Sequence, residues 1–373
     1  MNKIWSSVIA AIGKKPNTIN ILSSLFAILG GLLFGFILML IINPNLAFYG
    51  LYRITVGPLS SMRDIGWVLR NAAPILLTGL SVAFAFRTGL FNIGATGQLT
   101  VGAFFALYVG VNWTWLGPAH LWVALLAAVL GGAIWGAIPG LLKAFRNVHE
   151  VVASIMLNYI ALYMINLMVR TVLYHPDERA IYPASSARLP SWGLDSVFSF
   201  PGMNIGIIIA LVVAVIIHIV LNKTVFGYEL KSVGLSRPAA RYAGINEKSR
   251  VIYSMVIAGA IAGLAGGLMF LTSGVPFRLS NTLLMEGFTG IAVALLALSA
   301  PLGVIFAALF FSWITRGGNL ADRAYDPELI EIIVAVIIYF SALSLFMKRV
   351  IADFVKRRTK EDVQLQESQG DIT

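Results

Sequence analysis

The chain has 373 residues, of which 58% are hydrophobic and 12% are charged, a charged share about half of that in an average soluble domain. Together with the absence of cysteine, this composition excludes disulfides and thiolate zinc sites and indicates a polytopic membrane protein. The formal net charge of +10 does not indicate a nucleic-acid partner, because the basic residues collect at the ends of apolar runs, where they indicate topology.

Ten apolar runs are predicted as transmembrane helices. A short basic segment precedes the first run, and no signal-peptide cleavage site follows it, so we expect a retained helix there. The runs cover residues 19–42, 67–86, 97–111, 121–142, 151–174, 204–221, 251–272, 283–300, 302–315 and 329–347. The third and ninth runs are shorter than the ~20 residues of a straight span, so broken or tilted helices are expected there.

The distribution of basic residues predicts the orientation. With the amino terminus inside, most of the 27 Lys and Arg, including every lysine, fall on the cytoplasmic side, as the positive-inside bias requires. We therefore expect both termini in the cytoplasm, as a segment over residues 1–18 and a tail over 348–373 that is basic and then disordered. They flank a transmembrane domain over 19–347. Its external loop, 175–203, is predicted to pack and to face an external partner or cover the pore mouth, or to be a simple connector.

A polar and basic island, residues 222–250, interrupts the apolar runs on the cytoplasmic side. Ser236 is predicted to cap a short helix that Gly244 ends. Arg237 and Arg241 then form a basic pair four residues apart on that helix. Such an amphipathic helix suits docking to a soluble partner, and the alternative is an ordinary solvated loop.

Two series of glycines repeat every four residues within apolar runs. One series is Gly132, Gly136 and Gly140, and the other is Gly259, Gly263 and Gly267. Each series lies on one helix face, and close backbone approach through small residues is the main packing device between helices in lipid. The series therefore predict buried, tightly packed helices. The alternative is that they face a pathway and let the helices slide.

The stretch from Arg87 to Gln98, RTGLFNIGATGQ, joins two apolar runs with three glycines and several polar residues. Polar, irregular backbone at membrane depth is tolerated only where it is buried in protein or lines a cavity. This predicts a pathway element, the alternative being a tight turn at the cytoplasmic surface. Glu286, near the outer end of the eighth run, is a second candidate that could contact substrate, bond within the bundle or reach the interface. The predicted pathway residues are Phe91, Asn92, Gln98, Asn158 and Glu286.

No catalytic motif is present. The chain has no G-x-x-x-x-G-K-[ST] phosphate loop, no G-x-S-x-G elbow and no H-E-x-x-H metal motif, and its four histidines are scattered. The sequence therefore predicts no catalytic residues, no metal and no cofactor in this chain. An ATP-driven transporter that contains this chain would need a separate polypeptide to hydrolyse ATP.

Four motifs in the same order resemble the permease subunits of bacterial ABC importers for nucleosides and simple sugars, a group that includes the ribose and branched-chain amino-acid permeases. They are GLFNIGATGQ, NVHEVVASIMLNYIALYMIN, the loop FGYELKSVGLSRPAARYAGI leading into AGAIAGLAGGLMF, and GFTGIAVALLALSAPLGV. The resemblance covers residues 67–347, and the second motif is most like the nucleoside branch. The chain departs from the family pattern at Thr96 and Thr289, which stand where relatives have acids, and at Ala297, where they have glycine.

The resemblance implies an all-α fold like that of the vitamin B12-importer permeases, in a bacterial plasma membrane. It implies a second, homologous permease, a cytoplasmic ATPase that uses ATP and Mg, an external substrate-binding lipoprotein and a nucleoside substrate. The helix in the cytoplasmic island would be the coupling helix that fits a groove on the ATPase. The residues expected to couple are Ser236, Arg237, Ala240, Arg241, Tyr242, Ala243 and Gly244.

The residues are also compatible with other functions. Ribose-like sugars or branched-chain amino acids are the alternative substrates. A secondary transporter or channel without an ATPase would need intramembrane charges for coupling, and the apolar runs hold few acids besides Glu286 and Glu331. A membrane scaffold would not need an irregular polar interior.

Overall fold

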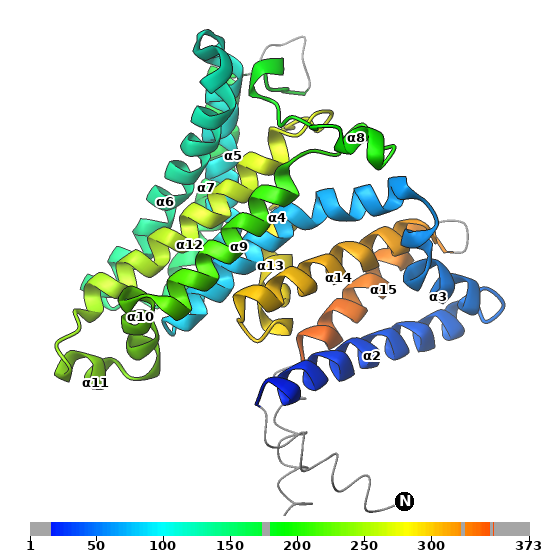
Figure 1. Cartoon of the computed structure of the whole chain (residues 1–373), viewed down its shortest axis with the longest axis horizontal. Helices are drawn as coiled ribbons and strands as arrows, with labels where there is room; N and C mark the ends of the chain where they lie inside the picture. Colours follow the sequence, from blue (N-terminus) through cyan, green and yellow to red (C-terminus); the bar gives the residue numbers. More distant parts are fainter. Residues whose placement is uncertain (1–15, 174–179, 322–324, 344–345, 347–373) are drawn as a thin grey trace, which may run out of the picture. The chain divides into compact units, whose positions relative to one another are not determined.

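The computed structural model describes residues 16–173, 180–321, 325–343 and 346. The chain divides into two compact units, one formed by Met1–Leu51 and Asp322–Thr373 and the other by Tyr52–Ala321. Over the described residues the regular structure is helical apart from one isolated antiparallel bridge (Figure 1). Seven of the described helices are long and apolar enough to span a membrane. The prediction of an all-α, multi-pass membrane protein is therefore confirmed.

The smaller unit consists of two long apolar helices and part of a short one. Its elements are α2 (Pro16–Ile42), α15 (Pro327–Ala342) and the first half of α3 (Ala47–Thr55). The first and last predicted spans pack together here, because a Cβ added to Gly31 would lie 2.6 Å from the carbonyl oxygen of Ile337. The rings of Phe34 and Phe340 also stack, with centroids 4.6 Å apart. Most of the predicted cytoplasmic segment 1–18 and all of the tail 348–373 lie outside the described residues.

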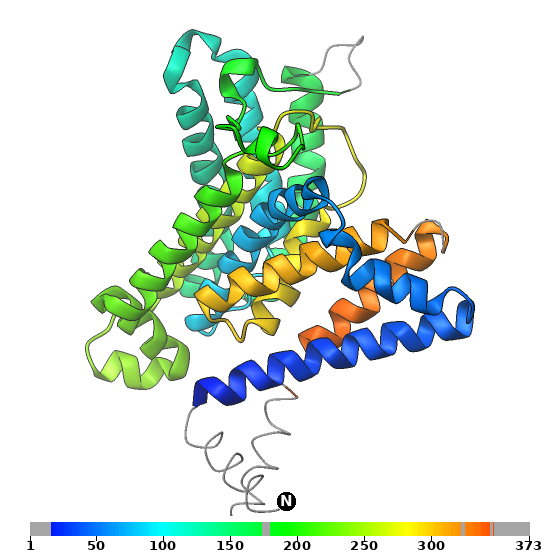
Figure 2. The same cartoon turned by 45° about the vertical axis from the view of Figure 1, so that its right-hand side comes forward.

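The larger unit holds the remaining helices. They are η1 (Gly57–Leu59), α4 (Met62–Arg87), α5 (Ala95–Asn112), η2 (Thr114–Ala119), α6 (His120–Arg146), α7 (Glu150–Val172), η3 (Ser185–Ala187), α8 (Leu194–Val197), α9 (Gly206–Lys223), α10 (Val225–Leu235), α11 (Arg237–Tyr242), α12 (Glu247–Phe270), α13 (Met285–Leu296) and α14 (Pro301–Asn319). Figures 1 and 2 show α4, α5, α6, α9 and α12 bundled together, with α10 and α11 at one end. Helix α4 also packs against α13 and α14.

Polar caps fix where several of these helices begin. The Ser61 hydroxyl accepts a hydrogen bond from the backbone N–H of Asp64 at the start of α4. The side chains of Thr224 and Asn246 do the same for Gly227 in α10 and for Ser249 in α12. Each cap satisfies an N–H that the first turn of a helix leaves unpaired.

The two glycine series face each other across the contact between α6 and α12. A Cβ added to Gly136 would lie 2.9 Å from the Gly259 Cα, and one added to Gly263 would lie 2.8 Å from the Gly132 Cα. Any side chain larger than hydrogen would collide with backbone at these positions. The two helices therefore pack backbone to backbone, the close approach that small residues permit between helices in lipid.

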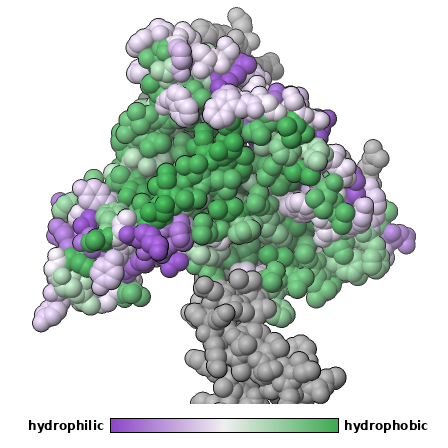
Figure 3. All heavy atoms as spheres, viewed as in Figure 1, coloured by the Kyte–Doolittle hydropathy of each residue, from purple (hydrophilic) through white to green (hydrophobic). Residues whose placement is uncertain are grey.

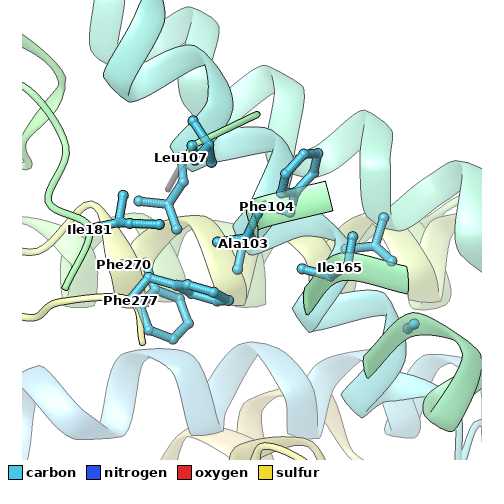
Figure 4. Packing of buried hydrophobic residues seen from close by; sticks show 11 residues of the cluster. Ala103, Phe104, Leu107, Ile165, Ile181, Phe270 and Phe277 are labelled. Carbon is cyan, nitrogen blue, oxygen red and sulfur yellow. The ribbon is translucent and has the colours of Figure 1, made fainter. Parts of the chain in front are cut away.

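The loop after α7 packs onto the bundle over the part that the structure describes. Ile181 and Phe277 exchange two backbone hydrogen bonds of 2.9 Å each, and the Leu189 N–H donates to the Leu271 carbonyl. Beneath the bridge lies an apolar cluster from α5, α7 and the end of α12, in which the rings of Phe270 and Phe277 meet with centroids 5.0 Å apart (Figure 4). This loop is a packed element. Whether it faces a partner stays a prediction.

Hydropathy on the surface follows the expected membrane layers. In Figure 3 the middle of the visible face of the larger unit is apolar, and hydrophilic residues gather at its ends. One polar end carries α10 and α11, together with the ends of α4 and α6 that bear Arg87 and Lys143. We refer to it as the basic end.

The eighth predicted span is where the sequence prediction is wrong. Residues 283–300 contain only the short helix α13, Met285–Leu296. The third and ninth predicted spans are the continuous helices α5, of 18 residues, and α14, Pro301–Asn319, of 19 residues, and of these two α14 is among the seven helices long and apolar enough to span a membrane. The chain before α13 is not helical. The continuous apolar run looks like one span, but positive φ angles at Leu298 and Ser299 end the helix early and turn the chain into α14.

Candidate translocation and coupling site

The break between α4 and α5, residues 88–94, belongs to a buried network of polar hydrogen bonds. Asn92 and Gln98 are 0% and 1% exposed. Their side-chain amides form a reciprocal pair, in which Asn92 Nδ2 donates to Gln98 Oε1 at 2.8 Å and Gln98 Nε2 donates to Asn92 Oδ1 at 3.1 Å. Asn92 also donates to the hydroxyl of Ser81 at 3.0 Å, and Ser81 in turn donates to the carbonyl of Ala258 in α12. The irregular backbone is thus buried in protein, one of the two conditions under which membranes tolerate it.

Asn158 of α7 also belongs to this hydrogen-bond network. Its Oδ1 accepts from the backbone N–H of Gly97 at 2.9 Å, and its Nδ2 donates to the carbonyl of Ile93 at 3.1 Å. One side chain thereby satisfies a donor in the first turn of α5 and an acceptor in the break before it. Phe91 lies half-buried in the break and stacks on Phe86, with centroids 5.0 Å apart. Four of the five predicted pathway residues therefore meet at the break.

Glu286, the fifth, lies half-buried in the first turn of α13. The Thr78 hydroxyl, in the interior of α4, donates to the Glu286 carbonyl at 2.8 Å. A Cβ added to Gly287 would lie 2.6 Å from the Cα of Thr96 in α5. The expectation that Glu286 lies near the outer end of a full span is thus corrected, because α13 begins only at the depth of Thr78. Of the two threonines where the chain departs from the family pattern, Thr96 lies where α13 meets α5, and Thr289 lies half-buried on α13 with its hydroxyl donating to the Met285 carbonyl at 3.0 Å.

Helices α10 and α11 form the candidate coupling element at the basic end. The Ser236 hydroxyl accepts from the Ala239 N–H at 3.4 Å, and Gly244, with φ of 81°, ends α11 in a conformation that glycine favours. Tyr242 is 96% exposed and Leu235 is 89% exposed. Ala240 is the buried residue of α11. The outward surface thus carries Tyr242 from α11 and Leu235 from the end of α10, and α11 packs on the bundle through Ala240.

A basic cleft lies beside α11. Its volume is about 510 Å³, and its lining comes from the end of α6, from α11 and from the start of α12. Arg241 in this lining pairs with Glu247, while Lys143 pairs with Glu150 at 2.9 Å. Lys248 lies over the ring of Phe145, 5.7 Å from its centroid. The lining residues are Lys143, Ala144, Phe145, Asn147, Arg237, Pro238, Arg241, Glu247, Lys248 and Val251.

A packed connection runs from α11 to the α4–α5 break. Ala240 belongs to an apolar cluster that also contains Leu90 of the break. Beside it, α10 touches the break directly, since a Cβ added to Gly234 would lie 2.9 Å from the carbonyl carbon of Thr88. Sequence reasoning did not identify Gly234, Thr78 or Ser81. A glycine near the end of a short polar helix was the only available signal for the first of them.

The family follows from comparison with known proteins. Residues 65–342 match the family described as branched-chain amino acid transport system, permease component. The chain belongs to this permease family. No solved structure matches it, so the expected likeness to vitamin B12-importer permeases stays a prediction.

Several curated relatives cover most of the chain. A guanosine ABC transporter permease protein of Bacillus subtilis is 39% identical over 91% of this chain and 97% of its own length. A second guanosine ABC transporter permease protein of the same organism is 30% identical over 74% of this chain and 90% of its own length. A glucose ABC transporter permease protein of Haloferax volcanii is 31% identical over 85% and 86%.

Proposed function

We propose that this permease is a subunit of an ATP-driven importer that carries nucleosides across a bacterial plasma membrane. The observation that carries the ATP-driven mechanism is the packed connection between the exposed helix α11 and the α4–α5 break. The nucleoside assignment is supported by the guanosine permease of B. subtilis, which is similar over nearly the whole of both chains. The basic end faces the cytoplasm in this proposal, as the positive-inside bias requires.

The mechanism follows from the contacts of α10 and α11. A cytoplasmic ATPase would bind the exposed face of α11 around Tyr242 and Arg237, and closure of the ATPase on ATP would push this helix. Ala240 shares an apolar cluster with Leu90 of the α4–α5 break, and Gly234 lies against its backbone. The movement of α11 would therefore be passed through the break to Asn92, Gln98 and Asn158. Reorientation of the break would then open the pathway to one side of the membrane at a time. ATP and Mg belong to the ATPase and not to this chain.

The assembly requires further subunits. The two guanosine permeases of B. subtilis both resemble this chain, which supports pairing with a second, homologous permease. An external lipoprotein that binds substrate and delivers it to the pair completes the proposed importer.

Uptake of labelled guanosine tests the function as a whole. We expect uptake to need this chain and ATP, and to be inhibited by excess uridine but not by ribose or leucine. The glucose permease relative favours a sugar as the second candidate. Competition by ribose without competition by uridine would therefore replace the nucleoside assignment, and uptake that persists after ATP depletion would remove the ATP-driven mechanism.

A charge reversal tests the coupling element separately. The double variant Arg237→Glu and Arg241→Glu should abolish copurification of the ATPase, because it inverts the charge of the face beside the cleft. Arg170→Glu is the matched control, since Arg170 is exposed near the other end of α7 and should leave copurification unchanged. Normal copurification and uptake in the double variant would show that α11 is not the coupling helix.

A further inference from the structure

A stripe of polar residues lies on the surface where the chain enters α13. It comprises Ser280, Asn281 and Thr282 in the non-helical segment, and Glu286 and Thr289 three residues apart in α13. We call these five residues the polar stripe. Asn281 and Thr282 are exposed, whereas Glu286 and Thr289 are half-buried. Over the described residues, Glu286 forms no ion pair and no hydrogen bond holds the side chain of Asn281.

Two contacts fix the depth of the polar stripe. At its outer end, Asn166 Nδ2 in α7 donates to the Ser280 carbonyl at 2.7 Å. At its inner end, the Thr78 hydroxyl donates to the Glu286 carbonyl at 2.8 Å. At ~1.5 Å per helical residue, Asn166 lies about 9 Å from the outer end of α7, and Thr78 lies about 14 Å from the inner end of α4. Both positions fall within a hydrocarbon layer of ~30 Å.

Exposed polar groups at this depth do not face lipid. Irregular backbone and an unpaired carboxylate in the hydrocarbon region occur where they line a water-filled cavity or are covered by protein. A further polar group lies behind the polar stripe, where the fully buried hydroxyl of Thr96 contacts Gly287. This hydroxyl has no hydrogen-bond partner among the described residues.

We propose that the polar stripe lines the aqueous translocation pathway and that Asn281 and Glu286 contact the substrate. The substrate contact rests on the proposed nucleoside function. Ribose hydroxyls and the N–H groups of a base can donate to the Glu286 carboxylate, and the Asn281 amide can both donate and accept. The pathway then runs past α13, the helix that is too short to span the membrane.

An aromatic side chain borders the polar stripe and fits the same class of substrate. Tyr163 is 61% exposed and lies three residues before Asn166, on the same face of α7. A nucleobase can stack on an exposed aromatic ring with a gain of about 1–3 kcal/mol. Polar contacts from the stripe and stacking on Tyr163 would together recognise the two halves of a nucleoside.

The absence of cysteine allows a direct test in the complete importer. Single cysteines replace Asn281, Thr282 and Glu286, and a charged, membrane-impermeant thiol reagent is added to membranes before the tagged chain is purified. We expect these positions to be labelled because the reagent reaches them only through water. Ile216→Cys is the matched control: Ile216 is 50% exposed in the interior of α9, and it should resist the reagent if it faces lipid.

The outcomes test two claims separately: that the polar stripe lines an aqueous pathway, and that Asn281 and Glu286 contact the substrate. If the polar stripe is no more reactive than Ile216→Cys, while all thiols react after denaturation, water does not reach the stripe in the importer and the proposal is wrong. Labelling that excess guanosine slows severalfold would support substrate contact. Labelling that guanosine leaves unchanged, in an importer that still transports guanosine, would refute the contact by Asn281 and Glu286. Labelling in an importer that does not transport guanosine would instead count against the nucleoside function.

An uptake measurement completes the test for Asn281 and Glu286. The variants Asn281→Leu and Glu286→Gln each remove a polar contact and should lower the uptake kcat/KM for guanosine by about tenfold, the typical effect of losing a hydrogen bond to a charged or polar partner. Leu279→Ala is the control in the same segment, since Leu279 packs on the apolar cluster and should not change the discrimination between guanosine and ribose. Unchanged kcat/KM in both polar variants would overturn the substrate contact.

Discussion

Replacing Gly234 by alanine should weaken the contact between α10 and the α4–α5 break. The added Cβ would lie 2.9 Å from the carbonyl carbon of Thr88 and 3.0 Å from the backbone nitrogen of Gly89. Carbon atoms normally approach to about 3.5–4.0 Å, so α10 must move by roughly half an ångström or more. Both obstacles are backbone, so a change of rotamer cannot relieve the collision.

The magnitude follows from two opposing effects. Adding a methyl group to a packed contact costs about 1–3 kcal/mol, while replacing glycine by alanine inside a helix gains roughly 0.5–1 kcal/mol. Steric strain therefore prevails, and we expect a net loss of about 1 kcal/mol in stability and a melting temperature about 2 °C lower. Because the displaced contact joins the coupling element to the break, uptake per ATP hydrolysed should also fall.

The assay is a melting curve of the purified importer together with uptake and ATP hydrolysis in proteoliposomes. Ser232→Ala on the same helix is the control, since its hydroxyl bonds to the Tyr228 carbonyl on an exposed surface. If Gly234→Ala melts and transports like the wild type, α10 does not bear on the break as described. If stability falls but the uptake per ATP is unchanged, the contact is structural and does not transmit the movement of α11 to the break.

Three further perturbations have defined outcomes. Gly263→Leu should destabilise the purified chain by about 1–3 kcal/mol, since even a Cβ would lie 2.8 Å from the Gly132 Cα; a melting temperature equal to wild type would contradict backbone packing of α6 on α12. Asn158→Leu should lower the stability of the folded chain by about 1–3 kcal/mol and speed hydrogen exchange at the Gly97 amide, which loses its acceptor. Unchanged exchange would show that Asn158 does not hold Gly97 in the hydrogen-bond network. Tyr242→Ala should leave melting unchanged, because the side chain is 96% exposed, and should weaken ATPase copurification, whereas a drop in stability would show that it packs on the bundle.

The sequence predicted those elements whose signal is local. The cap at Ser236 and the stop at Gly244 define α11 as expected, because capping and positive φ depend on the residues themselves. The polar run around Asn92 likewise marked an irregular segment between two apolar runs. The sequence could not show that Asn92 and Gln98 bond to each other, since that pairing depends on how the chain turns between them.

The depth of α13 depends on contacts far away in the chain. Its apolar residues continue to the turn before α14, so hydropathy predicts one span over the whole run. The helix nonetheless begins late, beside Thr78 of α4, and ends early at Leu298 and Ser299, two non-glycine residues with positive φ. Such residues rarely adopt positive φ on their own preference. Here the Ser299 N–H donates to the Ala294 carbonyl at 2.8 Å, and Arg87 of α4, far away in the chain, donates to the Ser299 carbonyl at 3.0 Å.

The backbone contact between α6 and α12 bears on how the importer moves. Helices that meet through long side chains can shift by changing rotamers, but between Gly132 and Gly259 no layer of side chains can yield. We therefore expect the two helices to travel as one rigid lever during the cycle. Because their ends carry two of the walls of the basic cleft, we expect those two walls to keep their spacing in every state, so that a change in the shape offered to an ATPase comes from α11, the third wall.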